Sequence, residues 1–454
     1  MIVRFSIENW MSFRDKAEFS MIATRERQHN ERVPRIKKYR TGILPITALY
    51  GGNASGKSNL FEALRFAQEL IVDGKRPGEP ISVKKTFCLD KRIEKHPTSF
   101  CFELLVNEKI YEYSFTATPK EIVEEMLVEI TGSSEKTLFH RVDGKANLHD
   151  SLKRKSDLEV YFKGTRENEL FLTNTVFQKV EAFLPVWSWF RNNLELIGPE
   201  FQFAPFERLG DDSDPLCSSV NGVLSQLDIG LLRLEGVEAS FDTVPLNNAT
   251  KEKLLEDIKE NEGIRLNFLP NTRLLLTNEN GTIKVRKLVA LHAGKNDCDV
   301  QFDLQDESDG SLRTIDLLPA LMALCAENSK KVFVIDEIDR SLHTLLTRSL
   351  LEMYLESCSP ESRSQLLFTT HDALLMDQDL LRRDEMWVAE RDSSGASRIF
   401  SFSEYKDVRY DKDIMKSYLQ GRLGGVPRIL LCGGGRKSDK SSPGSPIRGE
   451  NEER

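Results

Sequence analysis

Residues 46–64 read ITALYGGNASGKSNLFEAL, and this stretch decides the fold. A mostly apolar run, Ile46–Tyr50, leads directly into Gly51–Ser58, which fits the pattern G-x-x-x-x-G-K-[ST]. Apolar residues then recur at helical spacing, at Leu60, Leu64, Ala67 and Ile71. The order of strand, glycine-rich loop and helix predicts an α/β fold with a phosphate-binding loop.

This loop carries the groups that bind a nucleoside triphosphate. Its glycines allow successive backbone N–H groups to surround a phosphate chain, and the positive N-terminus of the next helix faces the same charge. We expect Lys57 to reach the β- and γ-phosphates and the Ser58 hydroxyl to ligate Mg²⁺. A chance match in a glycine-rich turn is the alternative, and the flanking strand and helix argue against it. The residues expected to contact ATP here are Asn53, Ala54, Ser55, Gly56, Lys57, Ser58 and Asn59.

A second motif, VFVIDE, occupies Val332–Glu337. An apolar strand of this kind places Asp336 at its carboxyl end, where open α/β sheets bind their ligands. We expect Asp336 to hold Mg²⁺ through its shell, and Glu337 to orient and deprotonate the attacking water. A strand ending in two solvated acids would look the same, so the prediction depends on the presence of the phosphate-binding loop.

Three further segments resemble, in their order along the chain, motifs of ABC-type ATPases. ESDGSLR, starting at Glu307, predicts a helix whose N-terminus carries small residues suited to an anion, although an ordinary capped helix start explains it equally well. Ser341–His343 lies where a D-loop would follow the acidic strand. The run LLFTTH ends in His371 and resembles the strand of ABC-type ATPases that ends in a switch histidine, which implies that His371 senses the γ-phosphate. A purely structural histidine is the alternative.

The order of these motifs resembles that of ABC-type ATPase heads such as RecF, SMC and Rad-type proteins. Lys57 and Asp336 lie 279 residues apart, which suits such a head better than a compact P-loop core. The resemblance implies an ABC-ATPase head with a P-loop core sheet, an antiparallel β lobe and a helical insertion. It also implies that Ser308 and Gly310 contact ATP in trans, on the P-loop of a second copy in a homodimer or higher even oligomer.

A closer resemblance is to the bacterial family called AAA ATPase/GTPase subfamily 15. It covers most of residues 1–430 and is weakest at about 130–300. Members are typically anti-phage defence ATPases of the AbiL type, related to the ATPase of the PARIS system and to the ATPase half of OLD nucleases. The stretches that carry it are IENWMSF, LYGGNASGKSNLFEAL, DGSLR, VIDEIDRSLH, TTHDALLMD, RRDEMWVAERD and YLQGRLGGVPRI.

This resemblance implies a nucleotide-switched sensor or scaffold in an abortive-infection system, with a separate nuclease or toxin as effector, encoded nearby. OLD nucleases carry a Toprim nuclease domain after the switch histidine. Only 83 residues follow His371, which we expect to be too few for that domain. Asp411-Lys412-Asp413 spells D-x-D, but it lies in a polar run that is typical of a solvated loop.

A P-loop also occurs in two other classes of protein, DNA repair or recombination ATPases and metabolic kinases. A RecF- or SMC-like DNA repair or recombination ATPase would act on DNA directly, whereas a defence sensor would detect a phage protein or another phage component. A net charge of −8, from 63 basic and 71 acidic residues, favours the defence sensor, while the basic stretch Arg422–Arg448 keeps the DNA-binding alternative open. A metabolic kinase is disfavoured because no acceptor-site motif accompanies the P-loop.

The sequence divides into four segments by composition and motif. The resemblance implies an N-terminal ABC ATPase lobe over residues 1–130 and a C-terminal lobe over residues 301–432 with signature, acidic strand, D-loop and switch histidine. Residues 131–300 form a helical or mixed insertion, a candidate dimerisation or partner-binding region, in which Trp187 and Trp189 are more readily explained as buried core. Residues 433–454 are rich in Gly, Ser, Pro and charge, which predicts a disordered tail.

Composition places the chain among cytoplasmic globular proteins. Hydrophobic residues make up 39% and charged residues 30%, and no run of roughly 18 apolar residues occurs that could cross a membrane. The N-terminus alternates apolar and polar residues and lacks the apolar core of a signal peptide. The seven cysteines form no CxxC pair and no cluster with histidine, which indicates reduced thiols.

Overall fold

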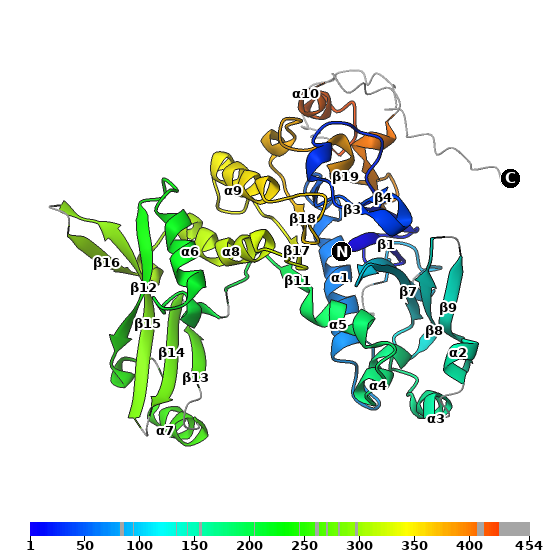
Figure 1. The fold of residues 1–454 in the computed structure, drawn as a ribbon, viewed down its shortest axis with the longest axis horizontal. Helices are drawn as coiled ribbons and strands as arrows, with labels where there is room; N and C mark the ends of the chain where they lie inside the picture. The colour runs from blue at the N-terminus through cyan, green and yellow to red at the C-terminus, as the bar shows by residue number, and fades with distance from the viewer. Residues whose placement is uncertain are drawn as a thin grey trace. The chain divides into compact units, whose positions relative to one another are not determined.

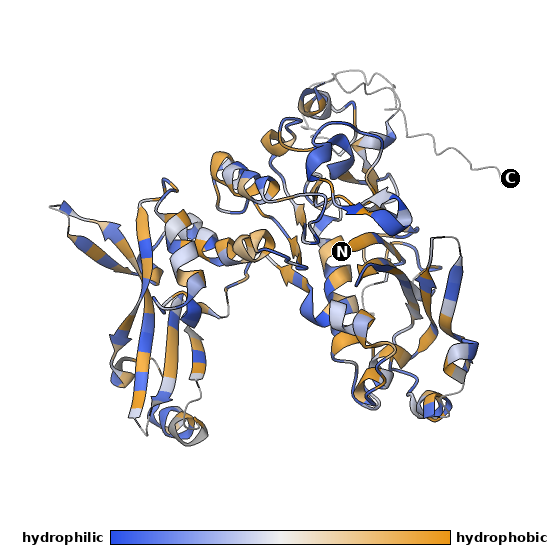
Figure 2. Ribbon diagram, viewed as in Figure 1, coloured by the Kyte–Doolittle hydropathy of each residue, from blue (hydrophilic) through white to orange (hydrophobic). Residues whose placement is uncertain are grey.

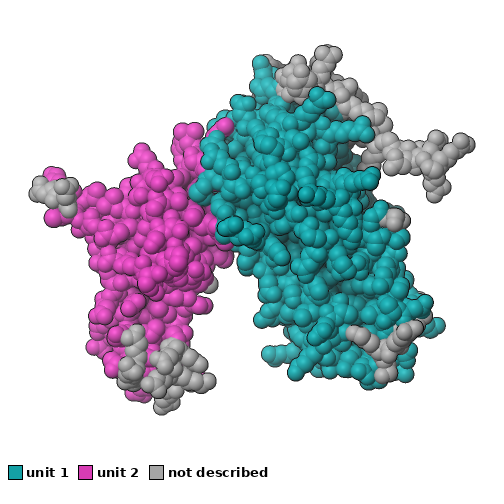
Figure 3. All heavy atoms as spheres, in the orientation of Figure 1, with its two compact units in different colours: residues 1–199, 324–339, 351–454 teal, residues 200–323, 340–350 magenta. Residues whose placement is uncertain are grey.

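The computed structural model describes residues 1–81, 86–93, 95–132, 134–142, 144–153, 157–203, 205–244, 246–258, 263–268, 271–279, 282–295, 298–405 and 413–425. The chain divides into two compact units (Figure 3). Unit 1 comprises Met1–Pro199, Leu324–Asp339 and Leu351–Arg454, and unit 2 comprises Glu200–Ala323 and Arg340–Leu350. These units differ from the four segments drawn from the sequence, because residues 131–199 belong to unit 1.

The core of unit 1 is a six-stranded sheet (Figure 1). Its first five strands run parallel and the last pairs antiparallel. The central strands are buried along their whole length, as parallel strands covered on both faces are. In spatial order the strands are β11 (Leu194–Ile197), β17 (Val332–Ile335), β18 (Gln365–Thr369), β5 (Ile46–Tyr50), β19 (Met386–Arg391) and β20 (Ser397–Ser401).

A seven-stranded antiparallel sheet forms the second layer of unit 1. The alternating runs Ser99–Val106 and Lys109–Ala117 predict a β-hairpin, which is present as β6 (Thr98–Val106) and β7 (Lys109–Ala117). Its two turn residues, Asn107 and Glu108, both have positive φ as the tightest hairpin turns require. The other strands, in the order β10-β9-β8 before this hairpin and β1-β2 after it, are β1 (Ile2–Glu8), β2 (Ala17–Ser20), β8 (Ile122–Ile130), β9 (Glu135–Val142) and β10 (Lys145–Leu148).

Helix α1 (Lys57–Val72) buries its apolar stripe in the main hydrophobic core of unit 1, and Figure 2 shows apolar residues along it. Helix α5 (Leu184–Asn192) packs against α1. Trp187 and Trp189 are both buried, and the Trp187 indole donates a 2.9 Å hydrogen bond to the Ile71 carbonyl. They are therefore core residues, and no part of a partner-binding surface.

Apolar residues recur at helical spacing over residues 171–197, which predicts a helix interrupted at Pro185, and the structure differs from this prediction. This stretch comprises α4 (Phe171–Phe177), α5 and strand β11, so the LELI segment is strand and not helix. Pro185 lies in the first turn of α5, where its missing N–H has no helical partner to lose, so it starts the helix instead of interrupting it. The remaining helices of unit 1 include α2 (Asp150–Lys153), α3 (Asp157–Gly164) and α10 (Ile414–Leu419).

Unit 2 is built on a five-stranded antiparallel sheet with its own apolar cluster. The insertion predicted over residues 131–300 as helical or mixed therefore contains a substantial sheet, and the sequence of Arg265–Leu291 predicts strands there. Its strands are β12 (Leu231–Ala239), β13 (Gly263–Phe268), β14 (Thr272–Glu279), β15 (Thr282–Ala293) and β16 (Asp299–Asp303), and its helices are α6 (Pro215–Leu224), α7 (Asn248–Asp257) and α8 (Asp309–Cys325). Helix α9 (Thr344–Glu356) continues from unit 2 into unit 1.

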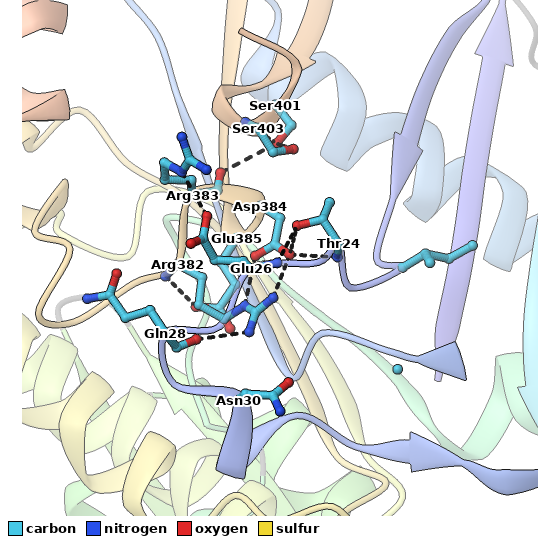
Figure 4. A network of polar contacts seen from close by, with 12 residues as sticks. Thr24, Glu26, Gln28, Asn30, Arg382, Arg383, Asp384, Glu385, Ser401 and Ser403 are labelled. Atoms are coloured by element: carbon cyan, nitrogen blue, oxygen red, sulfur yellow. Dashed lines mark hydrogen bonds and ion pairs between the residues drawn. The ribbon is translucent and has the colours of Figure 1, made fainter. Parts of the chain in front are cut away.

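A buried polar network fixes the segment before β19 to the N-terminal region of unit 1 (Figure 4). The guanidinium of Arg382 donates to Asp384 at 2.8 and 2.7 Å and to the Gln28 carbonyl at 2.9 Å. Thr24 donates from its hydroxyl to Asp384 at 2.7 Å. Every charge in this network has a partner of opposite sign, as buried charges require.

The predicted fold class is confirmed: the chain is α/β, with a parallel core sheet and antiparallel sheets. None of the helices in the described part of the chain combines the length and apolar character needed to cross a membrane. The expected disordered tail, residues 433–454, lies outside the described residues, as do Asp411, Lys412 and most of the basic stretch. Asp413 caps α10 by accepting the Lys416 N–H at 2.8 Å.

Candidate functional site

Three neighbouring parallel strands bring the predicted site residues of unit 1 to one edge of the core sheet. Strands β17, β18 and β5 are adjacent and in parallel register. Strand β5 leads into the glycine-rich loop, β17 ends before Asp336, and β18 ends before Thr370 and His371. The carboxyl ends of parallel strands are where open α/β sheets bind ligands. The fold therefore brings together side chains that lie hundreds of residues apart.

The glycine-rich loop adopts a conformation that two of its glycines make possible. Gly51 and Gly56 have φ of 151° and 113°, in the region that favours glycine. A Cβ atom at Gly51 would lie 2.5 Å from the Ala389 carbonyl oxygen, and one at Gly56 would lie 2.5 Å from Ser397 Oγ. Both positions therefore require glycine for steric as well as conformational reasons.

Lys57 begins α1 and turns its ammonium back into the loop. Its Nζ donates to the carbonyls of Gly51 at 2.8 Å and Gly52 at 3.3 Å. Burial lowers the pKa of Lys57 to about 8, although the carboxylates of Asp336, Glu337 and Asp339 act in the opposite direction. A positive group buried inside a loop of backbone amides is placed where phosphate oxygens would bind.

The two acids after β17 are held by a residue that the sequence analysis missed. The Thr369 hydroxyl donates to Asp336 Oδ1 at 2.6 Å and accepts the backbone N–H of Glu337 at 2.8 Å. Asp336 is buried, and Glu337 has φ of 52°, which is uncommon for a residue with a Cβ. A threonine that ends an otherwise apolar strand is the signal that could have identified it.

His371 lies beside Lys57, with 3.4 Å between His371 Nδ1 and Lys57 Nζ. Its backbone N–H donates to Asp339 Oδ2 at 3.3 Å. Partial burial and the positive charge of Lys57 lower the pKa of His371, against the opposing effect of the nearby carboxylates. The imidazole is therefore mainly neutral at pH 7, and one of its nitrogens can donate a hydrogen bond.

Side chains from β20 and from the N-terminal region support the glycine-rich loop through hydrogen bonds. Ser397 Oγ donates to the Ser55 carbonyl and contacts Ser12 Oγ, both at 2.7 Å. The Asn59 amide donates to Ser12 Oγ at 2.6 Å, and the Trp10 indole donates to the Asn59 carbonyl at 3.0 Å. Asn59, expected to contact ATP, thus uses its amide to brace the loop.

The residues present fit a nucleotide with a divalent cation. Ser55 Oγ is buried and has no hydrogen-bond partner within the described part of the chain, while Asn53, Ala54 and Ser58 are exposed. Among the described residues, no group of three or more His, Cys, Asp or Glu side chains is arranged to hold a metal ion. Mg²⁺ at phosphate sites is typically held by one or two protein ligands together with the phosphates, which here would be Ser58 and Asp336.

The segment predicted to be the signature lies in unit 2, at the start of α8. Ser308 Oγ accepts the Ser311 N–H at 3.1 Å and lies 3.0 Å from Ser311 Oγ, so it caps this helix. A Cβ at Gly310 would lie 2.8 Å from the carbonyl oxygen of Ser341, in the predicted D-loop. The predicted signature and D-loop therefore pack against each other, and the signature glycine is required for that contact.

A cavity of about 1320 Å³ lies elsewhere in unit 1. It is bordered by residues 24–28 and by the segment after His371, among other residues. None of the residues predicted to bind nucleotide lines it. The residues predicted to bind nucleotide therefore lie outside this cavity, at the glycine-rich loop and the strand ends.

The solved structures similar to the chain include an SMC head domain from Thermotoga maritima, at 13% identity and a TM-score of 0.37, with 88% of this chain and 98% of that chain covered. They also include an SMC head bound to the C-terminal winged-helix domain of ScpA, at 12% identity and a TM-score of 0.36, with 88% and 97% covered. No curated protein matches significantly. The profile of the family described as "AAA domain, putative AbiEii toxin, Type IV TA system" matches residues 46–377, and the chain belongs to this family.

Proposed function

We propose that this protein is an ATPase that binds and hydrolyses MgATP. The observation that carries the proposal is the meeting of Lys57, Asp336, Glu337 and His371 at adjacent strand ends, with Lys57 Nζ inside the glycine-rich loop. Membership of an AAA domain family supports it, because nucleotide binding is the general property of such P-loop domains.

Each residue has a defined part in the proposed reaction. Backbone amides of Asn53–Gly56 and the Lys57 ammonium would bind the phosphates. Ser58 and Asp336 would hold Mg²⁺, which neutralises charge on the β- and γ-phosphates. Glu337 would take a proton from the water that attacks the γ-phosphorus as ADP leaves. His371 would donate a hydrogen bond to the γ-phosphate and so distinguish ATP from ADP.

The catalytic unit in this proposal is a head-to-tail pair. Ser308 and Gly310 at the N-terminus of α8 would contact the γ-phosphate of the ATP bound by a second copy. Closure follows because both surfaces gain contacts with one ligand, and hydrolysis removes the shared contact. ATP would therefore switch the chain between paired and separate states.

The biological role that we propose is a nucleotide-switched sensor or scaffold in a cytoplasmic anti-phage system of the abortive-infection type. The family description, which refers to an Abi toxin and a toxin–antitoxin system, supports this class of role. A separate nuclease or toxin would be the effector, and a phage protein or another phage component would be the trigger.

Steady-state ATP hydrolysis by purified protein tests the enzymatic part. The wild-type chain should hydrolyse ATP, and Glu337→Gln should bind ATP but hydrolyse it at least about 100-fold more slowly, since it lacks the base. A wild-type rate for Glu337→Gln would contradict the role given to this residue. Adding duplex DNA separates the two biological roles: stimulation with steep salt dependence would replace the sensor with an ATPase that acts on DNA.

A further inference from the structure

Unit 2 contains an ion pair that is almost completely buried, between Arg273 on β14 and Asp316 on α8. Arg273 Nη2 lies 2.8 Å from Asp316 Oδ1 and 3.0 Å from Oδ2. The side chains are only 1% and 6% exposed. This pair joins the five-stranded sheet directly to the helix whose N-terminus carries the predicted signature residues.

Asp316 is also bound by the main chain. The backbone N–H of Phe203 donates to Asp316 Oδ1 at 2.8 Å. Asp316 follows Gly310 by six residues, which corresponds to about 9 Å along the axis of α8. A carboxylate held from two sides at this distance restrains both the rotation and the axial position of the helix start.

Stability alone does not account for the pair. Removing two charges from water carries a desolvation cost, and a protein with apolar residues of similar size in their place is often at least as stable. Burial raises the pKa of Asp316, against the effect of Arg273. Arg273 Nε and Nη1 are buried without a hydrogen-bond partner within the described residues, which adds to the cost. Such a pair does provide a directional contact, which holds α8 in a single position against the sheet.

A second tie from the same sheet holds the other side of the signature segment. His292 on β15 lies with its Nε2 2.5 Å from Glu307 Oε1. Strands β14 and β15 are neighbours in antiparallel register. The sheet therefore contacts the chain at Glu307, immediately before Ser308, and again at Asp316, about two helical turns after it.

We propose that Arg273 is a positioning residue for the shared ATP site. By holding Asp316 it fixes α8, so that Ser308 and Gly310 present the helix N-terminus to ATP on the P-loop of the partner copy. Arg273 would contact neither nucleotide nor water itself. This inference rests on the proposed head-to-tail function and adds that the five-stranded sheet of unit 2 governs the trans half of the site.

Complementation between two impaired variants tests the positioning role of Arg273. In the double variant Arg273→Met/Asp316→Leu both charges are replaced by apolar groups, which avoids leaving one charge buried alone. Its P-loop lies in unit 1, so its affinity for a fluorescent ATP analogue should stay within about twofold of wild type, while its ATPase rate should fall at least about tenfold. Lys57→Ala is the complementary variant, with a defective P-loop and an intact signature.

Mixing the two should restore hydrolysis to at least about fivefold above the sum of the separate rates, because one site of each mixed pair combines an intact P-loop with an intact signature. Loss of analogue binding by the double variant, or no recovery on mixing, would overturn the positioning role. The control Arg265→Met removes a partly exposed sheet arginine that pairs with Glu207 at 2.7 Å and should keep the wild-type rate. An equal loss in Arg265→Met would attribute the effect to general loosening of the sheet and overturn the proposal.

A parallel mixture of Ser308→Arg with Lys57→Ala separates this inference from the function on which it rests. Recovery in that mixture but not in the first would overturn only the role of Arg273. No recovery in either mixture would overturn the shared site itself, and with it the positioning role. Recovery in both mixtures is the result that we expect.

Discussion

Thr369 donates a 2.6 Å hydrogen bond from its hydroxyl to Asp336 Oδ1, across the neighbouring ends of β18 and β17. The Thr369 hydroxyl oxygen also accepts the Glu337 N–H at 2.8 Å, and this bond holds Glu337 in its left-handed conformation. One hydroxyl thus orients both the proposed Mg²⁺ ligand and the proposed base. Two adjacent acids can then serve different functions because their backbone and side chains are fixed from one point.

Replacing Thr369 with Val should impair hydrolysis more than nucleotide binding. Valine has nearly the same shape but no hydroxyl, so Asp336 and the Glu337 amide lose this partner, at a cost of about 1–3 kcal/mol. We expect kcat to fall at least about tenfold and the Mg²⁺ concentration for half-maximal rate to rise. Thr47→Val on β5 is the matched control, since the Thr47 hydroxyl donates to the Ile46 carbonyl outside the site. Equal kinetics for Thr369→Val and wild type would remove Thr369 from the mechanism.

Replacing Lys57 with Ala should abolish nucleotide binding and leave the fold intact. The ammonium donates to the carbonyls of Gly51 and Gly52 and lies beside His371, and Lys57 is not part of the hydrophobic core, so its loss should leave that core unchanged. Titration with a fluorescent ATP analogue should show an affinity at least about 100-fold lower, with an unchanged circular dichroism spectrum. Retained affinity in a folded Lys57→Ala protein would argue against this loop as the phosphate site.

Replacing Gly56 with Ala should distort the loop even though only one methyl group is added. The new Cβ would lie 2.5 Å from Ser397 Oγ at a φ of 113°, a strained position for alanine. We expect a loss of about 1–3 kcal/mol in the free energy of unfolding, together with weaker ATP binding. The double variant Gly56→Ala/Ser397→Gly should regain only part of this loss, because the backbone strain remains. Full recovery would show that the contact alone matters.

The Arg32–Glu385 pair predicts a specific pH dependence of stability. The pair is buried, with 2.6 Å between Arg32 Nη2 and Glu385 Oε2, and burial raises the pKa of Glu385 to about 7. Since the folded pKa exceeds the unfolded one, this group's stabilisation is complete below about pH 4.5 and is lost as pH rises through 7. When the pH is raised from 5 to 8, the free energy of unfolding of wild type, measured in urea, should fall by about 2 kcal/mol relative to that of Glu385→Gln. A constant difference between the two proteins would contradict the raised pKa.

The local parts of the site were predictable because each follows from a short pattern. The run Ile46–Tyr50 and the helical spacing after Ser58 predicted strand β5 and helix α1, which begins at Lys57. The apolar strand before Asp336 and the one before His371 were identified in the same way. Period and composition act over a few residues, so they define single elements well.

The supporting contacts were not predictable because they join distant positions. Ser397 reaches Ser12 across 385 residues, and no sequence pattern relates the two. Arg273 and Asp316 are polar residues in otherwise ordinary strand and helix patterns, and only burial in the folded unit makes them distinctive. The break of the helical run around Pro185 was misplaced because proline is compatible with a first turn as well as with an interruption.

The central claim, that ATP pairs two copies through a shared site, is tested most directly by the solution mass of Glu337→Gln. Light scattering should be measured with and without MgATP, since this variant should hold ATP without hydrolysing it. We expect a mass near 51.8 kDa without nucleotide and about twice that value with it. A mass that stays at one copy under both conditions, in protein shown to bind ATP, would contradict it.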